Sequence, residues 1–85
     1  MEMTMERQEY RTLSPYITGY LDSLQFNYHL ERGHNGKVFF VFQDTPELQK
    51  AVETFRIDQY INPNEFSERI KRAKSRMYDE LERRR

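Results

Sequence analysis

Apolar residues recur at helical spacing in three parts of the chain, and a proline stands near the start of each. Along residues 13–24, 48–55 and 66–81 the apolar side chains are mostly three or four positions apart, which places them on one face of a helix. A Ser, Thr or Asn precedes each proline; these residues cap free N–H groups, and proline is favoured in a first helical turn. The pattern predicts helices at about residues 14–24, 46–56 and 63–83, beginning at Ser14-Pro15, Thr45-Pro46 and Asn62-Pro63.

Between the first two helices the apolar period changes from helical to alternating. Phe26, Tyr28 and Leu30 alternate with polar residues, which is typical of a strand with one buried face. The pair Asn35-Gly36 can adopt the positive φ angles of a tight hairpin turn. Residues 38–42 are apolar on both faces, which indicates an interior strand. We therefore expect a β-hairpin with strands at about 26–31 and 37–42.

The predicted order of elements is that of a small α+β domain. If the short stretches 10–12 and 59–61 are also strands, the order becomes βαββαβ plus a C-terminal helix, a ferredoxin-like arrangement. If neither is a strand, the hairpin packs with three helices. Both alternatives remain open on the sequence. We expect one domain over residues 9–82, a mobile N-terminus at 1–8 and a basic tail at 83–85.

Four short stretches occur in an order and spacing typical of one protein family. They carry the patterns Tyr-x-Thr, Phe-x-Phe-x-Asp, Asn-Pro-x-x-Phe and Lys-x-x-Met-Tyr, within residues 9–12, 39–44, 61–66 and 74–78. With these motifs the chain resembles a small family of uncharacterised bacterial and phage proteins, a domain of unknown function. The resemblance implies a small soluble domain, and it brings no activity and no catalytic residue. Such proteins usually have a glycine after the first helix, where this chain has Gln25 or Phe26.

Composition narrows the classes of protein that the chain can belong to. It has no cysteine, which excludes disulfides and Cys-rich zinc sites. Its longest apolar run, residues 38–42, is far shorter than the roughly 20 residues of a membrane span. The polar, acidic start is unlike a secretory signal. These features predict a cytoplasmic protein that does not contact a membrane.

The formal net charge is zero, but basic residues gather in the last helix. Four arginines lie along one flank of that helix and a fifth follows in the tail, so that the row could bind phosphates or an acidic protein surface. Acidic residues stand four positions from several of them, as in Glu65 with Arg69 and Asp79 with Arg83, or Glu68 with Arg72 and Arg76 with Glu80. Such pairs favour the other interpretation, a solvated face held by ion pairs. The candidate binding residues are Arg69, Arg72, Arg76, Arg83 and Arg84.

No group of residues forms a recognisable catalytic motif. His29 and Glu31 share one face of a predicted strand and could bind a metal or move a proton, but the sequence suggests no third ligand. His34 lies in the predicted turn. A nuclease-like acidic cluster would need Asp22, Glu31, Asp44 and Glu47 to meet, yet strand and helix ends explain Asp44 and Glu47. We predict no catalytic, cofactor-binding or metal-binding residue and no small-molecule substrate.

The sequence thus favours a non-enzymatic interaction module that binds nucleic acid or a nucleoprotein through its basic C-terminal helix. The alternative is a protein-binding regulator, such as a phage-type inhibitor, with no nucleic-acid contact. The opposite charges of the body and the last helix could also pair between copies, as in a homodimer.

Overall fold

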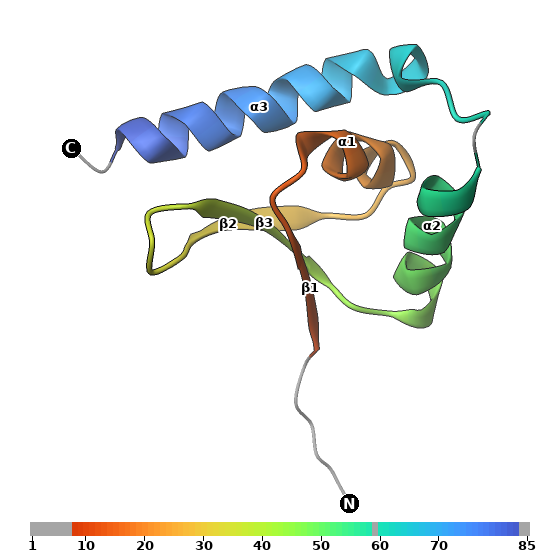
Figure 1. The fold of residues 1–85 in the computed structure, drawn as a ribbon, viewed down its shortest axis with the longest axis horizontal. Coiled ribbons are helices and arrows are strands. Elements are labelled where there is room, and N and C mark those ends of the chain that lie inside the picture. Colours follow the sequence, from red (N-terminus) through yellow and green to blue (C-terminus); the bar gives the residue numbers. More distant parts are fainter. Residues whose placement is uncertain (1–7, 59, 84–85) are drawn as a thin grey trace, which may run out of the picture.

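The computed structural model describes residues 8–58 and 60–83, and it confirms the α+β class. Figure 1 shows the elements in chain order. They are β1 (Glu9–Thr12), α1 (Pro15–Ser23), β2 (Tyr28–Arg32), β3 (Val38–Gln43), α2 (Pro46–Ile57), the 3-10 turn η1 (Pro63–Phe66) and α3 (Ser67–Glu82).

The three strands form one antiparallel sheet in the order β1-β3-β2. The strand with two apolar faces, β3, is therefore the middle strand, as predicted. The stretch at residues 10–12 is part of β1, whereas Tyr60 and Ile61 lie outside the sheet and residue 59 is not among the described residues. The elements β1 to α2 follow the ferredoxin-like order, but among the described residues no strand follows α2.

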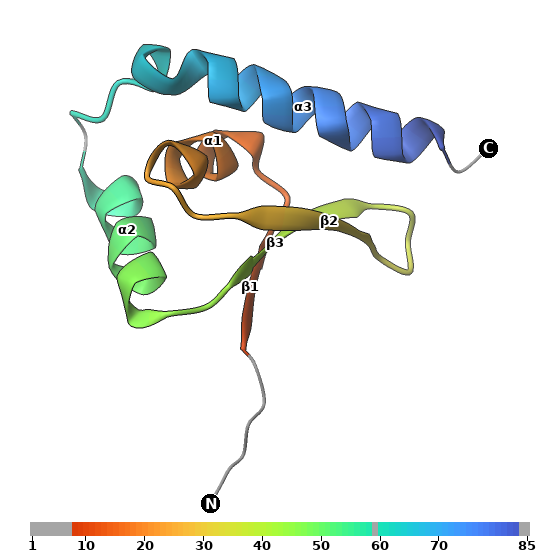
Figure 2. The ribbon, with the colours of Figure 1, turned by 180° about the vertical axis from the view of Figure 1, so that it is seen from behind.

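All three helices lie on one side of the sheet, and the other side carries no helix (Figures 1 and 2). On the helix side, Phe40 and Phe42 of β3 are almost completely buried. They pack into one apolar cluster with residues of α1, α2 and α3, namely Ile17, Leu21, Leu48, Val52 and Ala73. The core therefore lies between the sheet and the helices.

The predicted caps of the first two helices are present. Ser14 Oγ accepts from the N–H groups of Tyr16 and Ile17 at 3.2 and 3.4 Å, and Thr45 Oγ1 accepts from Leu48 N at 3.1 Å. The third start differs from the prediction, because residues 63–66 form a 3-10 turn before α3 begins at Ser67. Asn62 Oδ1 accepts from Asn64 N at 3.0 Å and so caps this turn.

The end of α1 uses a left-handed residue that is not glycine. Gln25 has φ 78°. Its N–H donates to the carbonyl of Asp22 at 2.9 Å, and the N–H of Phe26 donates to the carbonyl of Leu21 at 3.1 Å, which together form a Schellman motif. Phe26 then packs against the core as part of this cap. The strand predicted from residue 26 therefore begins only at Tyr28, and the hairpin strands are 28–32 and 38–43.

The helix α3 lies directly against α1, because Gly19 leaves room for it. A Cβ atom at Gly19 would lie 2.6 Å from Ile70 Cγ1 and 2.9 Å from Ile70 N. Ile70 and Ala73 are buried at this contact. The close approach places the C-terminal end of α1 beside the first turns of α3, where most of the candidate arginines lie.

Candidate functional site

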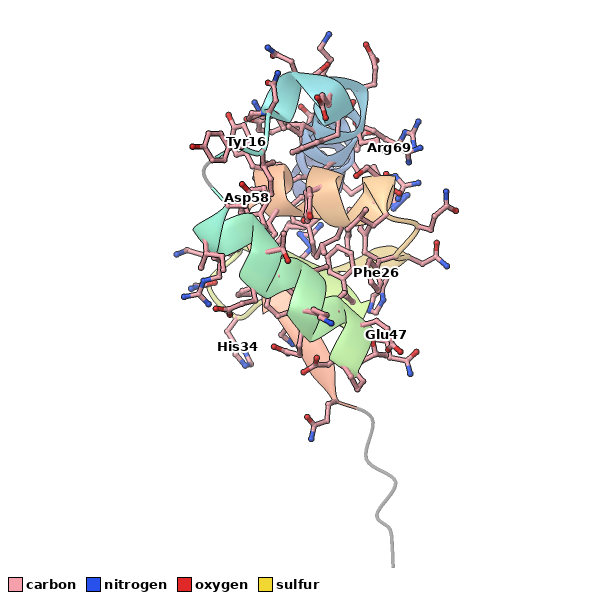
Figure 3. All side chains as sticks on the ribbon, turned by 90° about the vertical axis from the view of Figure 1, so that its right-hand side faces the viewer. Tyr16, Phe26, His34, Glu47, Asp58 and Arg69 are labelled. Carbon is pink, nitrogen blue, oxygen red and sulfur yellow. The ribbon has the colours of Figure 1, made fainter. Side chains whose placement is uncertain are left out.

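Three of the candidate arginines, Arg69, Arg72 and Arg76, form a row along α3 on the side of the molecule where β2 lies. We call these three residues the arginine row. Their spacing of three and four positions places them on one flank of the helix. In Figure 3, Arg69 projects on the side opposite to Tyr16. The structure therefore brings together three of the five predicted site residues.

Asp22, near the end of α1, holds the first two arginines of the row. Its carboxylate lies 3.3 Å from Arg69 Nη1 and 3.7 Å from Arg72 Nη1. Arg69 Nη1 also donates to the carbonyl of Asp22 at 3.4 Å, at the negative end of the α1 dipole. The Asp22 side chain is 19% exposed, whereas that of Arg72 is 55% exposed, so the acid is covered and the base faces water.

The third arginine is held by an aromatic ring. The guanidinium of Arg76 lies 5.2 Å from the ring centroid of Tyr28, the first residue of β2. A hollow of about 290 Å³ separates the row from β2 and is lined by Asp22, Asn27, Tyr28, Arg72 and Arg76. The buried hydroxyl of Tyr28 has no hydrogen-bond partner among the described residues.

Of the other two predicted site residues the structure describes only Arg83, and Arg83 does not join the row. Arg83 lies beyond the acidic end of α3 and pairs with Glu80 at 3.7 Å. Arg84 lies outside the described residues. Lys71 and Lys74 belong to the same turns of α3 but lie on other flanks of the helix, and Lys71 pairs with Glu68. Lys74 lies 5.0 Å from the ring centroid of Tyr16, on the opposite flank.

The predicted ion pairs at four-residue spacing within the last helix are wrong. None of those four pairs is within ion-pair distance in the described part of the chain. Glu68 instead pairs with Lys71 at 3.9 Å, and Glu80 pairs with Arg83 and with Arg32 of β2. The acids of α3 therefore do not pair with the arginine row, and Asp22 pairs with Arg69 and Arg72 instead. Sequence reasoning considered Asp22 only as part of an acidic cluster.

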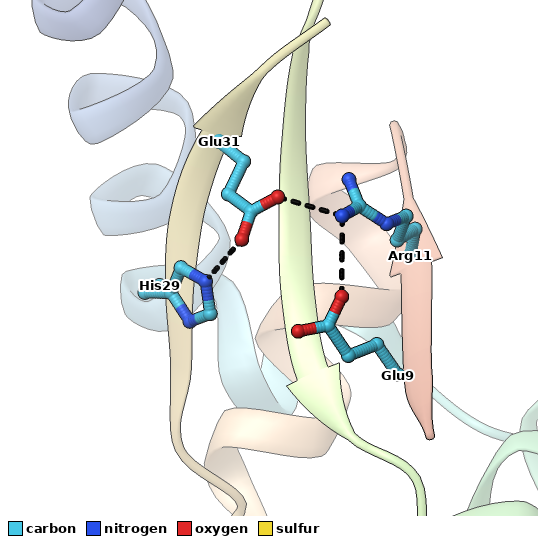
Figure 4. A network of polar contacts seen from close by, with 4 residues as sticks. All are labelled: Glu9, Arg11, His29 and Glu31. Atoms are coloured by element: carbon cyan, nitrogen blue, oxygen red, sulfur yellow. Dashed lines mark hydrogen bonds and ion pairs between the residues drawn. The ribbon is translucent and has the colours of Figure 1, made fainter. Parts of the chain in front are cut away.

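A second polar cluster lies on the helix-free side of the sheet (Figure 4). His29 Nε2 and Glu31 Oε2 are 2.8 Å apart, as their alternation in one strand predicts. The other oxygen of Glu31 accepts from Arg11 Nη2 at 2.7 Å, and Arg11 also donates to Glu9 at 3.1 Å. Sequence reasoning missed Arg11 and Glu9 because they come from β1, on the far side of β3.

Hydrogen bonds within this cluster shift the pKa values of Glu31 and Arg11. Hydrogen bonds from His29 and then from Arg11 lower the pKa of Glu31 below its ordinary value. Its carboxylate in turn raises the pKa of Arg11. The four side chains are about one-third exposed or more. Such a cluster can hold a surface together, and two hollows open beside it: one of about 290 Å³, lined in part by Glu9 and His29, and one of about 560 Å³, lined in part by Arg11 and Glu31.

The other candidate side chains are dispersed. Asp44 accepts from Gln49 Nε2 at 2.7 Å, Glu47 lies in the first turn of α2, and His34 is exposed in the hairpin turn. Within residues 8–58 and 60–83, no three His, Asp or Glu side chains are arranged to hold a metal ion. In the same residues, no helix has both the length and the apolar character to cross a membrane.

Comparisons with known proteins give a family and no function. The model of a family described as a domain of unknown function (DUF5659) matches residues 7–79 of the chain. No curated protein and no solved structure matches it. The match confirms the resemblance to a small uncharacterised family that the four sequence patterns indicated.

Proposed function

Because the chain belongs to the DUF5659 family, a domain of unknown function, we propose a function from its own surface. The protein is a non-enzymatic interaction module that binds the phosphate backbone of nucleic acid through the arginine row. Nucleic acid is a partner found in the cytoplasm, which is the compartment that we propose for it.

The observation that carries this proposal is the separation of charge along α3. The first three turns contain Arg69, Lys71, Arg72, Lys74 and Arg76 with Glu68 as their acid, whereas Asp79, Glu80 and Glu82 follow in the last turns. A concentrated positive surface attracts a chain of phosphates, and each contact releases counterions.

The contacts of the row support binding as well. Arg72 and Arg76 are exposed, yet Asp22 and the ring of Tyr28 restrict where their guanidinium groups lie. An arginine that is already oriented loses less side-chain entropy when it binds a phosphate than a free one does. The Arg72–Asp22 pair is long, at 3.7 Å, and the Arg72 side chain is 55% exposed, so that a phosphate can replace the carboxylate as a partner of Arg72.

The test is a titration of labelled single-stranded and double-stranded oligonucleotides with the full chain. We expect binding that weakens steeply between about 50 and 300 mM salt. The double variant Arg72→Gln/Arg76→Gln should reduce the slope of log affinity against log salt by roughly 1 to 2, and should weaken binding to different sequences alike. Arg69 keeps its contact with Asp22 in this variant.

The matched control is Lys50→Gln/Arg56→Gln, which removes the same charge from exposed positions of α2. This variant should bind as the unchanged protein does. If both double variants lose affinity equally, binding depends on overall charge and the arginine row is not the site. Absence of binding to every oligonucleotide at the lowest salt would overturn the nucleic-acid proposal.

A further inference from the structure

The two edges of the sheet differ in what lies beside them. At one edge, Arg32 of β2 donates to the carbonyl of Glu80 in α3, and a cavity of about 490 Å³ lies between Leu30 and α3 residues such as Arg76 and Glu80. At the other edge β1 is the outermost element, nearest to the viewer in Figure 1 and farthest in Figure 2. Among the described residues, β1 pairs with β3 alone, so its outer edge is not bonded to another strand.

The hydrogen bonds between β1 and β3 define which backbone groups of β1 point away from the sheet. The carbonyl of Gln8 accepts from Asp44 N at 3.0 Å. Hydrogen-bonded positions alternate along an antiparallel strand, so Tyr10 and Thr12 also bond to β3. The N–H and C=O groups of Glu9 and Arg11 therefore point outward, away from the sheet, and can pair with another strand.

Charge selects one way in which two β1 strands can pair. In a two-fold symmetric antiparallel pair, the residues whose backbone groups point outward lie opposite each other. Three arrangements are then possible: Glu9 opposite the second copy's Glu9, Arg11 opposite Arg11, or Glu9 opposite Arg11. The first two arrangements set like charges opposite each other, which is destabilising. The third places Glu9 opposite the second copy's Arg11 twice, with Tyr10 opposite Tyr10 at the symmetry axis.

Apolar side chains flank this edge on the same side of the molecule. Leu13, directly after β1, is 44% exposed, and Tyr16 of α1 is 48% exposed. Tyr16 projects in Figure 3 on the side opposite to Arg69. Exposed tyrosine and leucine beside a pairing edge are the residues that a subunit interface buries.

We infer that β1 is the interface with a second copy of this chain, which extends the sheet to six strands with Glu9 of each copy opposite Arg11 of the other. The strand is short, so the dimer is weak and its population depends on protein concentration. This inference does not depend on nucleic-acid binding, because the arginine row lies on the opposite side.

Charge exchange tests both the interface and its register. In sedimentation equilibrium, the unchanged chain should pass with rising concentration from its monomer mass of 10.5 kDa toward twice that mass. Glu9→Arg and Arg11→Glu, each alone, should raise the dissociation constant at least roughly tenfold, because two opposite-charge pairs become like-charge pairs. An equimolar mixture of the two variants should associate as the unchanged chain does, since each Arg again faces a Glu.

Controls keep the result interpretable. Glu9→Arg leaves the Arg11–Glu31 contact in place, so it decides the question even if Arg11→Glu fails to fold. Glu53→Arg makes the same charge change at an exposed position of α2 and should leave association unchanged. So should Arg72→Gln/Arg76→Gln, which separates this test from that of nucleic-acid binding.

A covalent test reports the symmetry axis directly. The chain has no cysteine, and residues opposite each other at a non-hydrogen-bonded position are close enough for a disulfide. Tyr10→Cys should form a disulfide-linked dimer on oxidation, whereas Thr54→Cys, exposed on α2, should not. A monomer at every concentration, dimers that survive Glu9→Arg, or equal crosslinking of the two cysteine variants would each overturn the inference.

Discussion

Phe40 and Val41 are neighbours on the middle strand, and both are buried, but they are buried in different ways. Phe40 points into the layer of helices, where apolar side chains from distant parts of the chain surround it. Val41 points to the helix-free side and is nevertheless only 1% exposed. The register places Arg11 of β1 and His29 of β2 on either side of it.

The comparison shows that long polar side chains can cover the middle of a small sheet. Arg11 and Glu31 come from strands that are not neighbours, and they meet at 2.7 Å across β3. Their stems contribute apolar contact while their charged ends stay in water. The helix side is therefore stabilised by apolar burial, and the other side depends in part on charge.

The largest effect is expected on the helix side. Phe40→Ala removes the ring that contacts Tyr28 at a centroid distance of 5.7 Å and leaves a cavity in the core. We expect a loss of about 3–5 kcal/mol in the free energy of unfolding, measured by urea denaturation. This is a large part of the stability of a small domain, so the variant should melt far earlier. A loss below about 1 kcal/mol would contradict the packing described for Phe40.

The next effect concerns the contact that holds α3 on α1. Gly19→Ala forces a methyl group against the Ile70 backbone, and backbone cannot rotate away as a side chain can. We expect a destabilisation of about 1–3 kcal/mol, despite the higher helix propensity of alanine. The thermal midpoint should fall, and Lys50→Ala, exposed on α2, serves as a control that should change little. A more stable Gly19→Ala variant would show that the helices do not touch there.

Val41→Ala gives the matching measurement for the helix-free side. It removes two methyl groups' worth of buried surface, about 1.5 kcal/mol at roughly 0.8 kcal/mol per group. The effect should be clearly smaller than that of Phe40→Ala in the same urea experiment. If Val41→Ala has no effect, the polar side chains do not exclude water from this position.

The smallest effect is expected in the dependence of stability on pH. The pKa of Glu31 is lowered in the folded state by His29 and Arg11. The stabilisation from this carboxylate is therefore present above its ordinary value of 4.5 and is lost as the pH falls below it. Glu31→Gln should remove this stabilisation. The urea midpoint of the variant should therefore lie below that of the unchanged protein at pH 7, and the two midpoints should converge in acid. Glu53→Gln, which removes an exposed carboxylate from α2, is the matched control and should leave the urea midpoint at pH 7 nearly unchanged.

Local features of the fold were predictable from the sequence, and contacts between distant segments were not. The caps at Ser14 and Thr45 and the left-handed Gly36 of the hairpin turn depend on neighbouring residues, so their signals lie in a few positions of the chain, although Asn35 does not share the positive φ expected for the pair. Gln25 could not be recognised, because its left-handed backbone follows from the Schellman hydrogen bonds and the residue type gives no sign of it. The 3-10 turn before α3 likewise shares its sequence signals with an α-helix start.

The candidate site shows the same division more sharply. A helical wheel identified the arginine row, yet it pointed to acids of the same helix as partners. The actual partner of Arg69 and Arg72 is Asp22, at the end of a helix nearly fifty residues earlier, and the packing of α3 on α1, which is close at Gly19 and Ile70, brings them together. Similarly, Arg11 meets Glu31 because β3 enters between their strands, which is a property of strand order.

The close approach of Gly19 and Ile70 also has a consequence for synthesis of the protein. During translation, α1 and the hairpin emerge well before residue 70, and until then the surface of α1 around Gly19 has nothing to cover it. The nascent chain can thus form its early turns and strands, but it cannot complete its hydrophobic core until α3 has been made. A ribosome stalled before that point would carry a partly folded chain with exposed apolar surface, which is prone to aggregation.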